Sequence, residues 1–396
     1  MINSNRTSES IYWVAIVVLI LFVALIRIRL LDIPLERDEG EFAYMGQLML
    51  QGVPPYSEAY NLKLPGIYAA YALIMFVFGQ TVSGIHLGLL IVNALTIVAV
   101  YLLARRLFDP IAGIVTASSY AILSLSQTVL GLAGHATHFA LLPALVGILL
   151  MLRGMETDSR STFFLSGIFF GVSFLMKQPA IFFAVFAVSY FVALRIKARS
   201  FKRSRGCILA LILGGTLPFV LTCILLFSAG VFERFWFWTF TYAANYATGT
   251  PFVVGINLLL EAIPRVIGSS ILLWTLAGVG LTTMWWNENA RKHSLFLIMF
   301  LAFSFLAVSS GLYFRAHYFI LILPAVSLLI GVAVCSLRQV ARRKVSRYYL
   351  SCCLSRSLLS QSDTQFSSSN RYSSGYRRRT LADGFMAEIP SPNHSA

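Results

Sequence analysis

The chain has 396 residues, of which 58% are hydrophobic and only 12% are charged. An ordinary soluble domain carries about 25% charged residues, so this composition excludes a soluble globular protein. Many apolar runs approach the roughly 20 residues that cross a bilayer as one helix. They are continuous and do not alternate with polar residues, which argues against a strand barrel. The sequence therefore predicts an all-α polytopic membrane protein.

The net charge is +15 and is unevenly placed. Residues 338–396 hold ten Lys and Arg against three Asp and Glu. Such an excess can indicate nucleic-acid binding, but the excess of Lys and Arg in the cytoplasmic loops of membrane proteins explains it better. We therefore predict no nucleic-acid partner. The five cysteines have no spacing typical of a zinc site or a disulfide framework.

Ten apolar runs are predicted to be membrane spans, with boundaries accurate to a few residues. The first run is too long for a removed signal peptide and lacks its small-residue cleavage site. The predicted spans are 11–31, 84–104, 110–130, 135–152, 161–176, 178–195, 206–228, 266–286, 294–310 and 317–337.

An eleventh apolar stretch, 65–78, has only 14 residues, a length that fits either a span or an interfacial helix. Charge decides between them. If the N-terminus is inside and this stretch does not cross, thirteen Lys and Arg lie in inner loops and eight on the outer side. If it crossed, the basic cluster at 195–205 would face outward, against the positive-inside rule. We therefore expect an interfacial helix here, a second one near 38–51, and both termini in the cytoplasm.

The domain organisation follows from the same patterns. Residues 1–340 form one transmembrane domain. Residues 341–396 are rich in Ser and Arg and have no apolar periodicity. This composition is typical of a disordered tail, and a loss of the reading frame after about residue 345 would produce it too. The sequence leaves both explanations open.

The first outer loop holds a cluster of acids. Asp38, Glu39 and Glu41 follow the first span, and Phe42 and Met45 continue at helical spacing, which indicates an amphipathic helix on the membrane surface. One explanation is a helix start, where the dipole favours negative charge. The other is a general base at the bilayer surface, because an acid at this depth is costly without a role or a partner.

Three basic residues on the same predicted side suit a phosphate. Lys63 precedes Pro65, which can begin a helix; it is either a lysine that snorkels to the interface or a phosphate ligand. Arg315 and His317 open the last span. The arginine fork matches a phosphate, and its combination with Lys63 and the acids favours a ligand role over an interface anchor.

Further polar residues are candidates for lining a substrate cavity. His135 and His138 could bind a metal, but no third ligand is evident, so we assign no metal-binding residue and leave a divalent metal open. No cofactor is firmly predicted. Lys177 and Gln178 lie between two spans with almost no loop and should line a cavity. The expected cavity residues are Glu41, Tyr44, His135, His138, Lys177 and Gln178.

The long outer loop begins with the aromatic run 235–238. An aromatic belt at the membrane interface explains it, and stacking on a sugar or a prenyl chain is the alternative. The sequence contains no P-loop, no nucleophile elbow, no zinc-protease motif and no dinucleotide fingerprint. This argues against an ATPase or an enzyme of soluble nucleotides.

In this order, these residues resemble the GT-C membrane glycosyltransferases. The similarity is to the bacterial branch related to dolichyl-phosphate-mannose–protein mannosyltransferases and lipid A aminoarabinose transferases, and it covers about residues 10–340. The motifs that carry it are Asp38-Glu39-Gly40, Lys63-Leu64-Pro65, Lys177-Gln178-Pro179 and Arg315-Ala316-His317-Tyr318-Phe319.

The resemblance implies a GT-C helix bundle with a juxtamembrane helix in the first outer loop. Such an enzyme transfers a sugar, mannose-like or another hexose or pentose, from a polyprenyl-phosphate donor to a hydroxyl of a lipid, glycan or protein. It acts on the outer face of a bacterial plasma membrane, with inversion. Asp38 would be the general base, with Glu39 replacing or supporting it. Lys63, Arg315 and His317 would bind the donor phosphate.

The chain also departs from the family pattern. The Lys63-Leu64-Pro65 motif lacks one proline, and His135 and His138 stand where relatives carry Asn, Asp or Glu. Relatives commonly continue into further spans or an outer domain, so we expect a truncated version. The alternative function is a transporter or lipid flippase, which would place charges near mid-span, where this sequence is apolar. A non-catalytic scaffold would leave the outer acids and bases unexplained.

Overall fold

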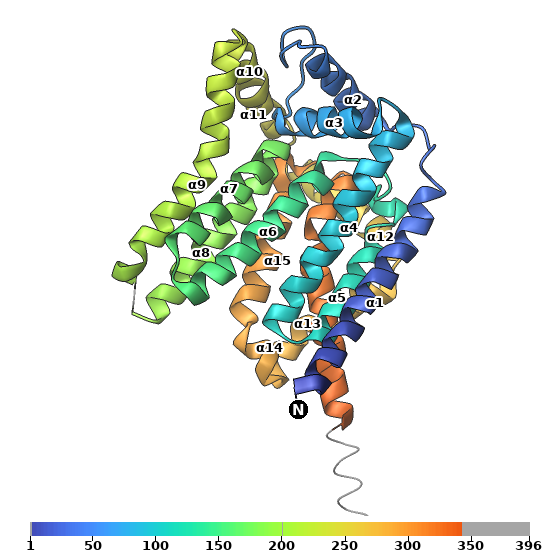
Figure 1. Ribbon diagram of the computed structural model, residues 1–396, viewed down its shortest axis with the longest axis vertical. Coiled ribbons are helices and arrows are strands. Elements are labelled where there is room, and N and C mark those ends of the chain that lie inside the picture. The colour runs from blue at the N-terminus through green and yellow to red at the C-terminus, as the bar shows by residue number, and fades with distance from the viewer. Residues whose placement is uncertain (1, 200, 343–396) are drawn as a thin grey trace, which may run out of the picture. The chain divides into compact units, whose positions relative to one another are not determined.

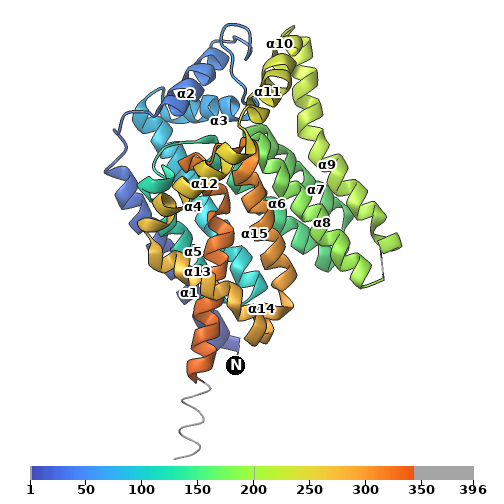
Figure 2. The same ribbon diagram turned by 180° about the vertical axis from the view of Figure 1, so that it is seen from behind.

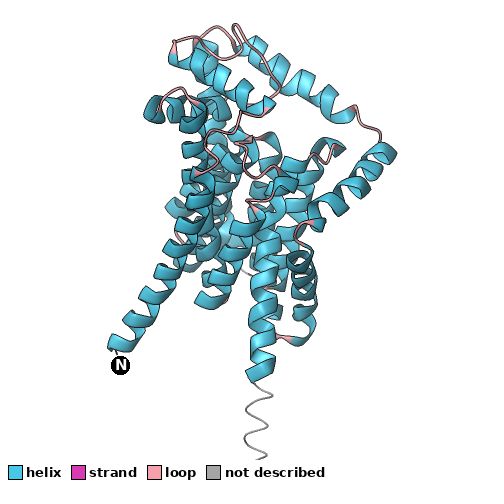
Figure 3. Ribbon diagram, turned by 90° about the vertical axis from the view of Figure 1, so that its right-hand side faces the viewer, coloured by secondary structure: helices cyan, strands magenta, loops and turns pink. Residues whose placement is uncertain are grey.

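The computed structural model describes residues 2–199 and 201–342. Every regular element in these two ranges is a helix, as Figure 3 shows, which confirms the predicted all-α polytopic class. The predicted tail lies outside the described residues from position 343 onward. The chain divides into a first unit, Met1–Ser336, and a second, Leu337–Ala396. The architecture and the sites below belong to the first unit.

The helices follow one another through short connections. The first half contains α1 (Ile2–Ile28), α2 (Arg37–Leu50), α3 (Gly66–Phe78), α4 (Val82–Leu107), α5 (Pro110–Leu123), η1 (Gln127–Val129), α6 (Ala136–Thr157), α7 (Arg160–Met176), η2 (Gln178–Ala180) and α8 (Ile181–Lys197). The second half contains α9 (Phe201–Ser228), α10 (Phe232–Trp236), η3 (Phe237–Tyr242), α11 (Ala243–Thr248), α12 (Phe252–Gly268), α13 (Ile271–Trp286), α14 (Glu288–Lys292), α15 (Ser294–Ser309), η4 (Ser310–Leu312) and η5 (Ala316–Ile322).

Among the described residues, seven helices are long and apolar enough to cross a membrane, or eight if the bent pair Phe232–Thr248 and Phe252–Gly268 forms one span. All seven coincide with predicted spans. The other three predicted spans are the shorter apolar helices α5, α7 and α13, so the count of ten stays a prediction. Helix α3 is also short, and it lies across one end of the bundle beside α2 (Figure 1).

Close helix contacts in this bundle depend on small residues, which let two backbones approach within a membrane. Helix α7 packs extensively against α6 and α9. A Cβ atom built at Gly167 would lie 2.2 Å from the carbonyl oxygen of Leu211, and one at Gly214 would lie 2.0 Å from that of Phe164. A side chain at either position would separate α7 from α9.

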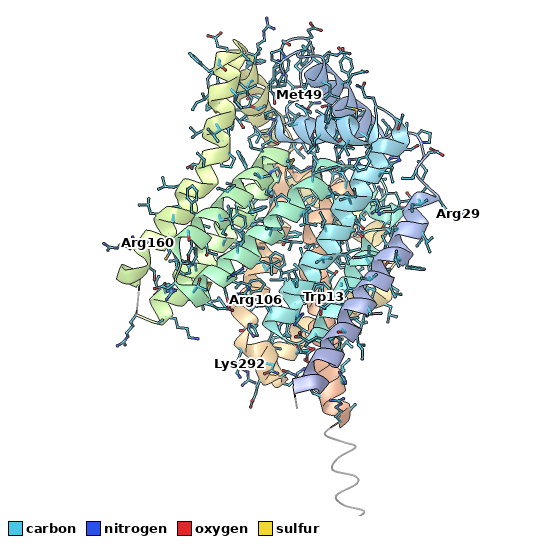
Figure 4. The ribbon with its side chains drawn as sticks, viewed as in Figure 1. Trp13, Arg29, Met49, Arg106, Arg160 and Lys292 are labelled. Atoms are coloured by element: carbon cyan, nitrogen blue, oxygen red, sulfur yellow. The ribbon has the colours of Figure 1, made fainter. Side chains whose placement is uncertain are left out.

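The bundle has two chemically different ends. We call the end with α2, α3 and α11 the site end; Figure 2 shows it from behind. The opposite end, which we call the far end, carries Arg106 and Lys292, both labelled in Figure 4.

The two ends give a topology prediction. A reporter fused at residue 58, at the site end, should report the outer side of the membrane. A reporter fused at residue 200, between α8 and α9, should report the cytoplasm, because the surrounding loop is basic. Signals from the same side for both fusions would contradict this topology.

Candidate active site

The first turn of α2 is fixed by a capping box. The carboxylate of Glu36 accepts a hydrogen bond from the backbone N–H of Asp38 at 2.8 Å, and the carboxylate of Glu39 accepts one from that of Glu36 at 2.9 Å. This reciprocal pair satisfies backbone donors at the helix start. The helix-start explanation therefore holds for Glu36 and Glu39, while the Asp38 carboxylate takes no part in the cap.

Glu39 is buried, and both of its carboxylate oxygens have polar partners. Its carboxylate also accepts the N–H of Gly134 and lies 3.3 Å from Nε2 of His86. On the other side, the Tyr71 hydroxyl donates to the Gly134 carbonyl at 2.6 Å. A Cβ at Gly134 would lie 2.5 Å from that hydroxyl and 2.9 Å from the Glu39 carboxylate, so a side chain there would have to displace these two groups. Glu39 thus holds the turn before His135 and does not line the cavity described next.

Asp38, in contrast, opens onto a cavity of about 360 Å³ at the site end. This cavity brings together α2, the segment before α3, α11 and the start of η5. Two acids and four basic side chains are among its lining, which consists of Arg37, Asp38, Glu41, Asn61, Leu62, Lys63, Tyr246, Arg315, His317 and Tyr318. The structure therefore gathers the predicted base and all three predicted phosphate ligands, Lys63, Arg315 and His317, around one space.

The Asp38 side chain is buried but remains charged. Burial alone would raise its pKa, but opposing charges, led by the Lys63 ammonium and the ion pair with Arg37 at 2.8 Å, outweigh burial. The pKa of Asp38 is therefore lower than its ordinary value. A carboxylate that is ionised at neutral pH and faces a polar cavity can accept a proton.

Lys63 is positioned by its backbone. The Tyr56 hydroxyl donates to the Lys63 carbonyl at 2.7 Å, and the Gln178 amide donates to the Leu62 carbonyl at 2.5 Å. Burial lowers the pKa of the Lys63 ammonium, although Asp38 and Glu41 oppose this shift. Gln178 therefore acts on the site by holding the segment that carries Lys63.

A second lysine lies behind the first. Lys177 is buried at the end of α7, and its Nζ atom lies 4.3 Å from the centroid of the Tyr318 ring. Burial, reinforced by the nearby Lys63, holds its pKa well below the ordinary lysine value. Lys177 is thus a buried donor beside Lys63 and Tyr318.

Arg315 is held at the mouth of the cavity by tyrosines. Its guanidinium donates to the Tyr246 hydroxyl at 3.1 Å and lies 5.7 Å from the Tyr313 ring. The two tyrosine rings stack at 4.6 Å. The sequence did not link Tyr246 to Arg315, because only the tertiary structure brings α11 to that residue. Sequence reasoning also missed Arg37, although that residue directly precedes Asp38.

Glu41 is the second acid in the cavity. Burial raises its pKa to about 7; Asp38 adds to the rise and Lys63 opposes it. One of its carboxylate oxygens is buried and has no hydrogen-bond partner among the described residues. Glu41 therefore changes charge near neutral pH, inside the space where an anion would bind.

This gives a pH prediction. As pH rises through about 7, Glu41 gains a negative charge beside Asp38, so the affinity for an anionic lipid phosphate should fall. In Glu41→Gln this fall in affinity should be smaller. The lipid phosphate also titrates in this pH range, but it does so equally in experiments with wild type and with Glu41→Gln, so the difference between the two proteins reports Glu41. Binding of polyprenyl phosphate measured at pH 6 and pH 8 checks it. Glu58→Gln, an exposed acid in the following loop, is the matched control; an equal pH dependence in wild type and Glu41→Gln would contradict the prediction.

His135 and His317 supply a possible metal-binding set. Ligand atoms of Asp38, His135 and His317 lie within 4.8 Å of one another. His135 is buried, and neither of its ring nitrogens has a hydrogen-bond partner among the described residues; burial lowers its pKa to about 4, which leaves the neutral form that binds metals. The two imidazoles stack at 4.0 Å. The ring planes are nearly parallel, at 10° to each other.

The structure places the other predicted residues as follows. His138 is buried one turn into α6, outside the cavity lining, and Tyr44 is 52% exposed on α2. Lys177 and Gln178 line a second cavity of about 290 Å³, which shares Leu62, Lys63, Tyr246 and Tyr318 with the first. Its remaining wall is mostly apolar, including Ile181, Phe182, Ala243 and Ala247. A polar cavity and a mostly apolar one thus meet at Lys63.

Comparisons with known proteins agree with this architecture. The family model described as dolichyl-phosphate-mannose-protein mannosyltransferase matches residues 63–224, and no curated protein matches the chain. ArnT from Cupriavidus metallidurans, solved with undecaprenyl phosphate, aligns with a TM-score of 0.56 at 18% identity, over 85% of this chain and 63% of ArnT.

Two further solved structures come from Archaeoglobus fulgidus. Its oligosaccharyltransferase in complex with Zn and sulfate aligns with a TM-score of 0.52 at 16% identity, over 84% of this chain and 50% of that chain. Its oligosaccharyltransferase AglB, solved with an inhibitory peptide and a dolichol-phosphate, aligns with a TM-score of 0.50 at 14% identity, over 86% of this chain and 52% of that chain. The chain thus spans 50–63% of the length of these proteins. These similarities confirm that the described bundle has the predicted GT-C glycosyltransferase fold.

Proposed function

We propose that this chain is a membrane glycosyltransferase that moves a sugar from a polyprenyl-phosphate donor to an acceptor hydroxyl, with inversion at the anomeric carbon. The observation that carries the proposal is the junction of two cavities at Lys63, one polar and one mostly apolar. A lipid phosphate needs cations for its head group and an apolar path for its chain. The junction offers both, beside an ionised carboxylate.

In the proposed reaction, Asp38 accepts the proton of the acceptor hydroxyl. The hydroxyl oxygen then forms a bond to the anomeric carbon, and the bond from that carbon to the phosphate oxygen breaks. The electron pair stays on the phosphate, which gains one negative charge. Lys63 and Arg315 stabilise that charge, and stabilisation of developing charge is usually the largest catalytic contribution. A single displacement of this kind inverts the anomeric configuration.

Two more residues support the phosphate site. His317 lines the same cavity, and the buried Lys177 lies in the adjoining one. An anion at Lys63 would favour the protonated form of Lys177, because opposite charges stabilise each other at low dielectric. The ArnT and AglB structures that share this fold contain undecaprenyl phosphate and a dolichol-phosphate, which supports the same class of donor here.

A divalent cation would be held by Asp38, His135 and His317. It would supply positive charge next to the donor phosphate. The oligosaccharyltransferase of similar fold was solved with Zn.

The site is proposed to lie on the outer face of a bacterial plasma membrane. Thirteen Lys and Arg in the loops of the far end against eight at the site end support this orientation. The acceptor would be a lipid, glycan or protein hydroxyl that reaches the cavity from outside the cell.

The test is a product analysis. The full chain is reconstituted in liposomes with polyprenyl-phosphate-linked hexose or pentose donors, and free polyprenyl phosphate is measured by mass spectrometry. The proposal expects release of polyprenyl phosphate with at least one donor. A transporter or flippase would instead move the donor between leaflets with its sugar–phosphate bond intact, and that result with every donor would overturn the proposal.

A further inference from the structure

A cavity that lies among three long helices of the bundle has no part in the site described above. It is a groove of about 950 Å³ formed by α4, α6 and α7. It shares none of its lining residues with the two cavities at the site end. Figure 1 shows these three helices side by side below α3.

Each helix contributes one face to this groove. On α6, Leu142, Val146 and Leu149 line it at helical spacing, and all three are only partly buried. On α4, Leu95, which is exposed, and Leu102, which is partly buried, also line the groove. These apolar side chains would face the lipid phase of a membrane. The groove is therefore a concave apolar surface of a size typical of ligand sites.

The far end of the groove is basic. Its lining includes Arg105 and Arg106 in the last turn of α4 and Arg153 on α6. Along α6, Arg153 lies fourteen residues beyond Phe139, which lines the other end. At 1.5 Å per residue, the groove is about 21 Å long, which is two thirds of a hydrocarbon core of about 30 Å. An extended acyl chain with its phosphate at the arginines matches these dimensions.

The three arginines differ in their partners. Arg106 forms a bidentate pair with Glu156, at 2.7 Å and 3.2 Å, and Arg105 pairs with Glu9 at 2.7 Å. Each guanidinium has five N–H donors, so both retain donors beyond these pairs. Arg153 has no ion pair with any described residue, and its side chain is exposed at the end of the groove. The arrangement leaves one unpaired cation and several donors for an anion.

We infer that this groove is a binding site for an anionic phospholipid, with one acyl chain along α6 and the phosphate at Arg153 and Arg106. The phospholipid would come from the membrane leaflet at the far end, because all three arginines lie there. The ligand is distinct from the proposed sugar donor, whose phosphate would bind at the opposite end of the bundle.

The test titrates delipidated full-length protein with phosphatidylglycerol or phosphatidylcholine and counts bound lipids by native mass spectrometry. We expect one phosphatidylglycerol to bind at least tenfold more tightly than phosphatidylcholine. Arg153→Gln should weaken it roughly tenfold, the loss expected for a charge-assisted contact. Arg195→Gln is the matched control, because Arg195 pairs with Asp158 and does not line the groove.

A second variant changes the shape of the groove and leaves its charge unaltered. Val146→Trp should fill the groove and displace the lipid while leaving the arginines in place. Equal binding of both phospholipids, or unchanged phosphatidylglycerol binding in both Arg153→Gln and Val146→Trp, would overturn the inference. Displacement of phosphatidylglycerol by polyprenyl phosphate would also overturn it, since the groove would then belong to the donor.

Discussion

Replacing Asp38 with Asn should reduce turnover by roughly 10²–10⁴-fold, the usual contribution of a general base, with little change in donor affinity. The substitution keeps the shape of the side chain but removes its ability to accept a proton. Asp38 suits this role because it lines the polar cavity, while Lys63 and Arg37 hold its pKa below the ordinary value. The measurement is release of polyprenyl phosphate by the reconstituted chain.

The control for this variant is Asp32→Asn. Asp32 lies in the same connection, is exposed, and accepts a hydrogen bond from Ser83 outside the cavity. It should retain normal turnover. Near-normal turnover in Asp38→Asn would transfer the role to Glu41, the other acid in the cavity. Glu39 is a weaker substitute, because its carboxylate already accepts the N–H groups of Glu36 and Gly134.

Replacing Lys63 with Met should weaken the binding of polyprenyl phosphate by roughly 10–100-fold, since a hydrogen bond to a charged group contributes about 1.5–3 kcal/mol. Methionine keeps the length of the side chain but carries no charge. Loss of the ammonium also removes the cation that lowers the pKa of Asp38 and opposes the rise at Glu41. The acidic limb of the pH profile should therefore move to higher pH.

Two comparisons make this second prediction specific. Lys63→Arg keeps the charge and should recover part of the affinity. Lys197→Met removes an exposed lysine in the last turn of α8 and should leave the affinity for polyprenyl phosphate unchanged. Donor affinity in Lys63→Met equal to that of wild type would place the phosphate elsewhere, and Lys177 and Arg315 would be the next residues to vary.

Much of the candidate site could be predicted from local sequence signals. Asp38 and Glu41 stand out as acids next to a membrane span, and Lys63 and Arg315 as cations on the same predicted side. Glu39 carries the same signal as Asp38, yet the structure uses it to hold Gly134, almost a hundred positions along the chain. No local pattern separates the two acids, because their roles depend on which residues pack against α2.

The histidines show the same limit. His135 and His138 have a spacing that indicates a metal pair, but His138 does not line the cavity, and His135 stacks on His317 at 4.0 Å. The ligand atoms that lie near those of His135 belong to Asp38 and His317, which are distant from it in the sequence. Tyr246 reaches Arg315 in the same way.

By itself, the sequence determined that this is an all-helical membrane protein with acids and bases gathered toward one side. Those properties depend on the transfer of each side chain from water to lipid, which is a local quantity that sums along a helix. Only the tertiary structure decided that Asp38 faces the cavity, that Glu39 supports a turn, and that a groove ends at Arg153. These outcomes depend on contacts between helices far apart in the chain, and helix packing fixes such contacts without leaving a local pattern in the sequence.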